Sequence, residues 1–216
     1  MTDSKKSFWA KLWARPNSRW LLGIPIGGFV ALIVGAIGLG TVNTVMRATS
    51  TNEFCYECHS HEAFIKPEYE ASSHFVNASG VKAECKDCHL PKMEGHWFEY
   101  VATKIIVSKD IIPELRGVIN TQEKYNEYRP IGAEKVWRQY KKDDSRYCKH
   151  CHSVEQMDFE AQDRFAARRH QTAERRGQTC IDCHYGMVHK PPENAREILA
   201  KIDEEMKAEE EGEEGE

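Results

Sequence analysis

The chain has 216 residues, which is room for about one domain and a short anchor. Its formal charge is only −4, and this acidic balance argues against nucleic acid as a partner. The apolar content of 40% and the mean hydropathy of −0.65 are low for a protein that is linked to a membrane.

The N-terminal part of the chain predicts a single membrane anchor. Residues 1–19 are basic and aromatic, and residues 20–46 contain no charged side chain. A helix of this second segment is roughly 40 Å long at 1.5 Å per residue, which is enough to span a bilayer with some tilt. A cleaved signal peptide is the alternative, but its apolar region is normally only about 7–15 residues. We therefore expect an uncleaved anchor. Because basic residues precede it and Glu53, Glu57 and Glu62 follow it, we expect its N-terminus in the cytoplasm.

A five-residue pattern, C-x-x-C-H, occurs four times and uses all eight cysteines. The cysteines are Cys55, Cys58, Cys85, Cys88, Cys148, Cys151, Cys180 and Cys183, and the histidines are His59, His89, His152 and His184. The spacing is typical of covalently attached c-type haem, with the histidine as proximal iron ligand. Four disulfides or two zinc sites are the alternatives, but neither requires a histidine after every second cysteine. The sequence therefore predicts four covalently bound haems c, attached outside the cytoplasmic membrane of a bacterium.

The spacing of the motifs divides the rest of the chain into two halves. The motifs start 30, 63 and 32 residues apart, which suggests an internal duplication. We predict a periplasmic haem domain over residues 47–192, with halves at 48–100 and 148–190 and a helical linker at 101–147. The acidic tail, residues 193–216, is expected to start as a short helix and to end as a disordered, solvated acidic run, with a docking role as the alternative. The predicted fold is mostly α with much irregular structure: one transmembrane helix and a small tetrahaem domain built as two dihaem halves.

Six histidines lie outside the proximal positions: His61, His74, His96, His150, His170 and His189. Four of them follow the duplication, because each half contains a haem motif, a histidine, a second motif and a second histidine. His74, His170, His96 and His189 are therefore candidate distal ligands, one for each haem. Iron with two imidazole ligands is six-coordinate and suited to electron transfer. We expect His150, inside the third motif, to be a surface or core residue.

The sequence resembles the NapC/NirT family of membrane-anchored tetrahaem cytochromes, including the CymA-like members. The resemblance covers about residues 20–192 and rests on the anchor and on the segments TSTNEFCYECHS, ASGVKAECKDCHLP, KIIVSKD and GQTCIDCHYGMVHKPP. It implies a quinol dehydrogenase that oxidises membrane quinol, either menaquinol or ubiquinol. The electrons would pass to a periplasmic reductase or soluble cytochrome, with nitrate reductase as the leading partner.

The resemblance also implies roles for individual residues. His74, His170 and His189 match distal ligands, and Lys104 and Asp110 match a lysine and an acidic residue that serve quinol near the first haem. The chain departs from the family at two positions. His61 stands where many members have a methionine ligand, so either His59 or His61 is expected to ligate the first haem. Lys92 stands where many members have a histidine, which leaves His96, Lys92, Met93 or a partner chain as ligand of the second haem.

Three hypotheses about function remain from the sequence. The leading one is a quinol dehydrogenase that sits in the bacterial inner membrane by one span, with its haem domain in the periplasm. The second is a passive tetrahaem electron-transfer module without a quinol site of its own. The third, a terminal reductase with an open haem, is disfavoured because there are nearly enough histidines to fill every iron. The terminal acceptor and the oligomeric state, including a homo-oligomer, remain open.

Overall fold

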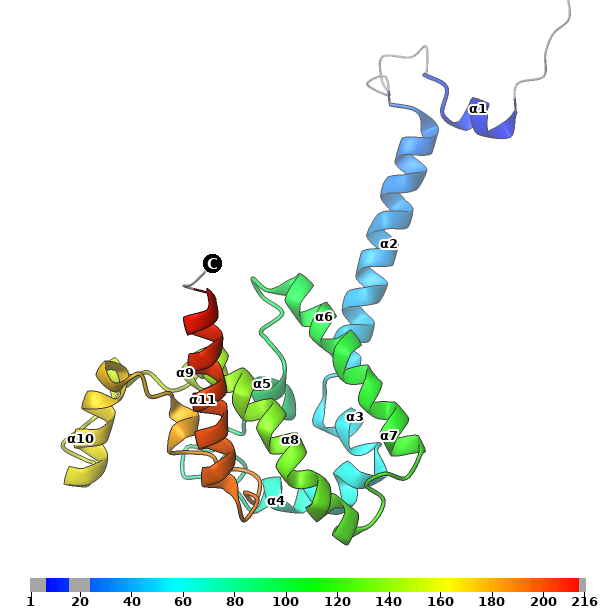
Figure 1. Ribbon diagram of the computed structural model, residues 1–216. Coiled ribbons are helices and arrows are strands. Elements are labelled where there is room, and N and C mark those ends of the chain that lie inside the picture. Colours follow the sequence, from blue (N-terminus) through cyan, green and yellow to red (C-terminus); the bar gives the residue numbers. More distant parts are fainter. Residues whose placement is uncertain (1–6, 16–23, 214–216) are drawn as a thin grey trace, which may run out of the picture. The chain divides into compact units, whose positions relative to one another are not determined.

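The computed structural model describes residues 7–15 and 24–213, and these residues form helices joined by turns and loops, without strands (Figure 1). They divide into two compact units, Met1–Thr49 and Ser50–Glu216. The mostly helical fold expected from the sequence is therefore correct. The parts of the predicted N-terminal segments at 1–6 and 16–23 lie outside the described residues.

The first unit consists of a short helix and a long apolar one. α1 spans Phe8–Leu12 and α2 spans Ile26–Ala48. α2 is the one described helix that is long and apolar enough to cross a membrane, and almost all its side chains are exposed. The hydroxyls of Thr41 and Thr44 donate to the carbonyls of Ile37 and Gly40, at 2.8 and 2.9 Å, so these polar groups are satisfied inside the helix. The helix ends two residues beyond the predicted segment 20–46.

The second unit contains the four motifs on short helical turns that are carried by longer helices. In chain order its elements are α3 (Asn52–Tyr56), a π-helical turn (His61–Ile65), α4 (Lys66–Glu70), α5 (Cys85–His89), α6 (Trp97–Val107), a 3₁₀ turn (Ser108–Asp110), α7 (Ile111–Leu115), α8 (Gln122–Lys142), α9 (Arg146–Lys149), a 3₁₀ turn (Val154–Gln156), α10 (Arg164–Ala173), two further 3₁₀ turns (Glu174–Arg176 and Cys180–Asp182) and α11 (Ala195–Glu213).

α8 is the scaffold of the second unit, because it contacts segments from both halves of the sequence. The Arg129 guanidinium donates two hydrogen bonds to the Glu68 carboxylate of α4, at 2.7 and 2.9 Å. The Tyr140 hydroxyl donates to the Cys88 carbonyl of the second motif, at 2.5 Å. Lys141 is buried and pairs with Asp182 of the fourth motif. The segment expected to be a linker therefore holds the motifs in place.

α11 packs along α8 and forms the apolar core with it. The core consists of Trp137, Ile181, Ala195, Ile198, Leu199 and Ile202, and Ile202 has no exposed surface. Outside this core, ion pairs join Glu134 to Lys201, Arg138 to Glu205 and Lys142 to Glu209. Each pair is separated by the same 67 residues, so the two helices run in the same direction.

The short helix expected at the start of the tail is longer than predicted, and the expectation of disorder is wrong for the acidic residues up to 213, because α11 spans Ala195–Glu213. The physical reason is the spacing of Ile198, Leu199 and Ile202, which places an apolar stripe on one helix face. The acidic side chains on the flanks of this stripe are neutralised by the basic residues of α8. The last three residues of the predicted tail, 214–216, lie outside the described residues.

Candidate haem centres

Each motif forms a compact turn that places two thiols and one imidazole on a short stretch of backbone. In the third and fourth motifs the backbone N–H of the histidine donates to the backbone carbonyl of the first cysteine. The distance is 2.9 Å for both His152 and His184. In the second and fourth motifs an aspartate caps the turn: Asp87 accepts from the Glu84 N–H and Asp182 from the Thr179 N–H, at 2.8 and 2.7 Å. These short turns have the cysteine and histidine spacing needed for attached haem.

The motifs meet in two pairs through their first cysteines. The thiols of Cys55 and Cys85 are hydrogen-bonded, and the bond from Cys85 lowers the pKa of Cys55 to about 7. The thiols of Cys148 and Cys180 repeat this contact, and the bond from Cys148 lowers the pKa of Cys180 to about 6. All eight cysteines are free of disulfide bonds. Among the described residues, no group of three or more His, Cys, Asp or Glu side chains is arranged to hold a metal such as zinc.

A polar residue lies three positions before the first cysteine of the first motif and of the third. In each case it makes a hydrogen bond to the first cysteine of the next motif. The Asn52 side chain accepts a hydrogen bond from the Cys85 backbone N–H, at 2.9 Å. Ser145, at the equivalent place before Cys148, makes a hydrogen bond to the Cys180 thiol. This repeated contact, like the shared aspartate in CKDCH and CIDCH, was not recognised from the sequence. The common aspartate was visible there, whereas the equivalence of an asparagine and a serine was not.

Three pairs of histidine rings lie opposite each other across a nearly constant gap, with interplanar angles of 34° for His89 and His189, 76° for His74 and His152, and 17° for His170 and His184. The ring centres of His89 and His189 are 6.3 Å apart, those of His74 and His152 are 6.2 Å apart, and those of His170 and His184 are 6.0 Å apart. A bond from a metal to an imidazole nitrogen is about 2 Å long, so two rings on opposite sides of one metal have centres roughly 6 Å apart. The three gaps therefore fit an iron held between a proximal and a distal histidine.

The surroundings of these rings favour neutral imidazole, which is the form that binds iron. Desolvation by the surrounding protein atoms lowers the pKa of His89 to about 4 and also lowers the pKa of His74, His184 and His189, although His89 and His184 keep exposed surface. One ring nitrogen of His74 and one of His189 are buried without a hydrogen-bond partner. These atoms are the Nδ1 atoms of both rings, and that of His189 lies 3.8 Å from the Glu68 carboxylate. A buried polar atom without a hydrogen bond is costly in a protein interior.

Two of the three ring pairs join the halves of the sequence. His74 lies between the first two motifs, yet its ring faces His152 of the third. His189 follows the fourth motif, yet its ring faces His89 of the second. The spacing of the sequence indicated four candidate histidines, but it did not indicate that His74 and His189 each lie opposite a motif of the other half. This pairing depends on how the two halves pack.

The structure does not bring His96 or Lys92 to the second motif's histidine. His96 precedes α6, its side chain is 56% exposed, and its Nδ1 lies 3.4 Å from the Glu99 carboxylate. Lys92 is exposed, and its charge contributes to a lowered pKa at His150, whose main cause is burial. The position opposite His89 is taken by His189 instead.

The first motif differs from the other three. The His61 Nδ1 atom lies 2.8 Å from the Cys55 carbonyl oxygen, whereas the His59 ring packs edge-on against Phe64, with centres 6.1 Å apart. No described histidine ring faces either of them in the way seen at the other motifs. Between them, Ser60 is buried and is bound through its N–H and hydroxyl to the Glu114 carboxylate, at 3.0 and 2.6 Å. Glu114 was not recognised from the sequence.

Lys104 lies beside the first motif, and Asp110 lies on the following turn. The Lys104 ammonium is 5.6 Å from the ring centre of Phe54, the residue before Cys55. Burial lowers the pKa of Lys104, and the Cys55 thiol opposes this shift. The Asp110 carboxylate is 61% exposed and lies 3.8 Å from the ammonium of Lys135 in α8.

The four motifs form a continuous series in chain order. The first contacts the second through Cys55 and Cys85, and the third contacts the fourth through Cys148 and Cys180. Cys88 of the second motif is close enough to Cys151 and Cys148 of the third for their charges to interact. Groups attached at these sites would therefore be neighbours along one path.

The sequence was compared with protein families and with curated proteins. Residues 17–194 match the family described as "NapC/NirT cytochrome c family, N-terminal region". The chain is 37% identical over 194 residues to the cytochrome c-type protein NapC of Escherichia coli K12, covering 89% of this chain and 94% of that protein. It is 41% identical over 167 residues to a putative tetraheme cytochrome of Allochromatium vinosum, covering 77% and 85% of the two chains.

A further relative, the cytochrome c-type protein TorY of Haemophilus influenzae, is 44% identical over 166 residues. That match covers 76% of this chain but only 44% of the TorY protein, so the chain spans less than half of this relative. No solved structure matches the chain.

Proposed function

Because the chain belongs to the NapC/NirT cytochrome c family, we propose that it oxidises membrane quinol and relays the electrons to a periplasmic reductase. It is a membrane-anchored cytochrome with covalently bound haem c, and the proposal adds four haems and a quinol site. The observation that supports it is the set of three histidine ring pairs, each with the separation that one iron between two imidazoles would need, at motifs that neighbour one another through their cysteines. Nitrate reductase is the leading partner, as the resemblance to the NapC/NirT family implies.

The protein side chains would hold the haems in a defined order. Each pair of cysteines forms two thioether bonds, and His89, His152 and His184 serve as proximal ligands of the second, third and fourth haems. We assign His189, His74 and His170 as their distal ligands, in the same order, from the facing rings. Bound haem c would supply one-electron carriers, and two histidine ligands to an iron would favour electron transfer over substrate binding. His59 or His61 ligates the first haem.

Lys104 and Asp110 would handle the quinol next to the first motif. Oxidation of one quinol to quinone releases two protons and two electrons, and the electrons leave one at a time. Lys104 can donate a hydrogen bond to a quinol oxygen, since its ammonium lies beside the segment that contains Cys55. Asp110 is exposed and can accept a proton and release it to water. Menaquinol and ubiquinol both fit this chemistry.

The test uses the full-length haem protein in liposomes that contain menaquinol or ubiquinol. We expect Lys104→Gln and Asp110→Asn each to lower the rate of quinol-driven haem reduction by about tenfold or more, with reduction by dithionite unchanged. Lys82→Gln is the matched control, because the Lys82 ammonium also lies over a phenylalanine ring, 4.0 Å from the centre of Phe75. Wild-type protein that quinol does not reduce would overturn the proposal.

One observation favours the alternative of a passive electron-transfer module. The ion-pair partner of Asp110 is Lys135, on α8, rather than a group of the first motif. A module without its own quinol site would receive electrons from a quinol-oxidising partner. In that case the Lys104 and Asp110 variants would be reduced as fast as the wild type once the partner is present.

The proposed location is the bacterial inner membrane, with a single span, a cytoplasmic N-terminus and a periplasmic haem domain. The apolar helix α2 and the relationship to NapC support the anchor. The orientation rests on the basic residues before the span and on haem attachment outside the cytoplasm. Protease added to spheroplasts should cleave the haem domain and so remove haem from the membrane fraction. Full protection of the haem domain from the protease would contradict this orientation.

A further inference from the structure

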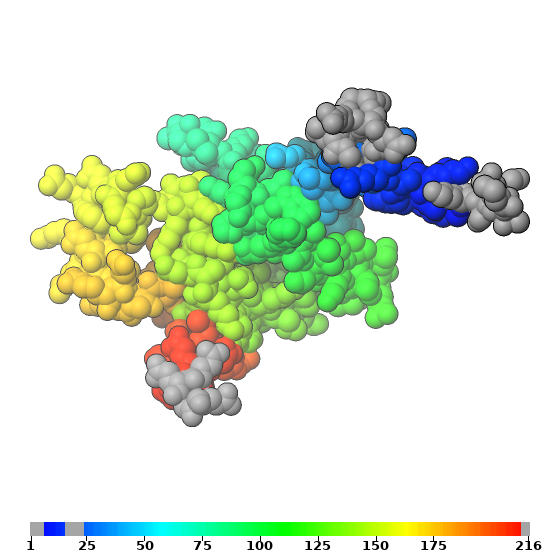
Figure 2. All heavy atoms as spheres, turned by 90° about the horizontal axis from the view of Figure 1, so that it is seen from above, coloured from blue at the N-terminus to red at the C-terminus, as the bar shows by residue number. Residues whose placement is uncertain are grey.

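The segment from α6 to α7 exposes a large amount of apolar surface. Phe98 and Leu115, near its two ends, are both 82% exposed, and between them Ile105, Ile106, Ile111 and Ile112 are 51–62% exposed. In the space-filling view this green segment forms part of the visible surface of the second unit (Figure 2). Contiguous exposed apolar patches are uncommon on soluble proteins and mark an interaction surface.

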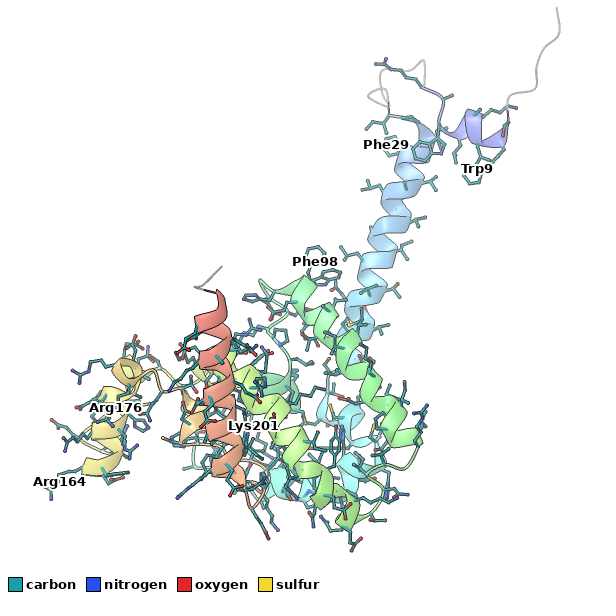
Figure 3. All side chains as sticks on the ribbon, viewed as in Figure 1. Trp9, Phe29, Phe98, Arg164, Arg176 and Lys201 are labelled. Atoms are coloured by element: carbon teal, nitrogen blue, oxygen red, sulfur yellow. The ribbon has the colours of Figure 1, made fainter. Side chains whose placement is uncertain are left out.

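The opposite face of α6 contacts the segment that precedes the first motif. The Tyr100 hydroxyl is hydrogen-bonded to the Ser50 hydroxyl, at 2.5 Å, and Lys104 lies over Phe54. Phe98 and Ile105 are two turns apart on a different face of the helix, and Phe98 projects from its beginning, away from α8 and α11 (Figure 3). The contacts of Tyr100 and Lys104 therefore engage one side of α6 and leave Phe98 and Ile105 exposed on another.

The acidic and basic side chains from α6 to Arg116 differ in whether they contact the rest of the second unit. Each acidic residue is engaged within the second unit: Glu99 with Arg146, Asp110 with Lys135 and Glu114 with Ser60. Lys109 and Arg116 are exposed and make no ion pair with any described residue. The outward side of the segment is therefore apolar with basic residues, which is the composition of helices that lie in a membrane interface.

The covalent chain ties this segment to the end of the apolar helix. Ser50 follows Ala48, the last residue of α2, by only two positions, and Ser50 holds Tyr100 of α6. A segment bound to the residues that leave the lipid lies within reach of the lipid surface, since two residues of chain span at most about 7 Å.

We propose that α6 and α7, residues 97–115, lie in the membrane interface as a second lipid contact beside the transmembrane anchor. The exposed apolar side chains enter the boundary between headgroups and acyl chains, while Lys109 and Arg116 reach lipid phosphates. The occupant of this surface is lipid, not a second copy of the chain or a reductase. The inference rests on the anchor and does not depend on quinol oxidation.

The experiment introduces the photo-crosslinker p-benzoylphenylalanine, one position at a time, into the full-length haem protein in liposomes with anionic lipid. The test positions are Phe98, Ile105 and Ile112. The control positions are Phe165 and Val76, which are 70% and 69% exposed on other parts of the second unit. Only variants with unchanged haem content and spectrum are irradiated, and lipid adducts are measured by mass spectrometry.

We expect lipid adducts at the three test positions at several times the yield of the controls. Equal yields at test and control positions would overturn the proposal, as would crosslinks to a second protein chain in place of lipid. Three independent positions keep the test decisive if one variant fails to assemble. The readout needs no quinol, so its failure is distinct from a failure of the proposed quinol site.

Discussion

At the scale of single residues, the candidate distal histidines show that position in the sequence does not decide whether a histidine lies opposite a proximal histidine. His189 and His96 both follow a haem motif within a few residues, so their sequence positions suggest similar roles. In the structure, the His189 side chain is 35% exposed and its ring lies opposite that of His89, whereas the His96 side chain is 56% exposed and lies beside Glu99. Burial and ring orientation distinguish the two, and both depend on contacts with distant parts of the chain.

The first prediction concerns this pair of histidines. His189→Ala removes the ring opposite His89, so we expect one haem to lose its sixth ligand and become high-spin. In the matched variant His96→Ala, every haem that is low-spin in the wild type should remain low-spin. Electron paramagnetic resonance and the visible spectrum of the oxidised protein measure the change. A high-spin signal that arises from His96→Ala instead would contradict the assignment.

At the scale of elements, the packing of α8 and α11 holds the fourth motif. Ile181, within that motif, is buried between the two helices together with Trp137 and Ile202. Lys141 of α8 contacts both Asp182 of the motif and Asp203 of α11, so one ammonium joins all three elements. α11 is therefore a structural part of the haem domain.

We predict that truncation of the core of this helix pair destabilises the protein. Ile202→Ala leaves a cavity at a fully buried position, which typically costs about 2–5 kcal/mol. Val81→Ala is the control, since Val81 is 68% exposed and its loss creates no cavity. Thermal unfolding of the haem protein should show a lower Tm for the first variant alone. Equal Tm values would show that α11 does not contribute to the core.

Because ion pairs join α8 and α11, we predict that the packing of α11 on α8 weakens at acidic pH. Hydrogen bonds from Lys201 and, to a smaller extent, Arg138 lower the pKa of Glu134, with burial opposing the shift. A carboxyl group whose pKa is lowered in the folded state stabilises it above the usual value of about 4.3, and this contribution is lost as the pH falls through the lowered pKa. We expect the amide protons of α11 to exchange faster below about pH 4, after correction for intrinsic rates.

The variant Glu134→Gln is the control for this pH dependence. It lacks the titrating carboxyl, so its α11 should exchange faster than the wild type at pH 7 and should change less on acidification. High salt should have a similar effect on the wild type, because these pairs are partly exposed. Identical pH dependence in the variant and the wild type would place the acid-sensitive group elsewhere.

At the scale of the whole molecule, the first motif stands apart from the other three. Three motifs have a histidine ring from elsewhere in the chain opposite their own, whereas His61 begins a π-helical turn and Glu114 binds Ser60, the residue between His59 and His61. π-helical turns are frequent at functional sites. The first motif also lies nearest in sequence to the end of α2.

We therefore predict three haems of one kind and one of another in the intact protein. Electron paramagnetic resonance with potentiometric titration should resolve three bis-histidine low-spin haems and one with a different spectrum or potential. Of the variants His59→Ala and His61→Ala, the one that removes the iron ligand should change only the distinct haem. Four equivalent bis-histidine haems in the wild type would contradict this prediction.

The sequence by itself determined the haem-attachment motifs, the apolar anchor and the supply of histidines, because each is a local pattern of neighbouring residues. The tertiary structure alone decided which histidine faces which motif. It also decided that α11 is ordered and that Glu114 reaches Ser60, 54 residues away. These features depend on contacts between residues far apart in the chain. Local spacing cannot encode such contacts, because they arise only when α8 brings the two halves together.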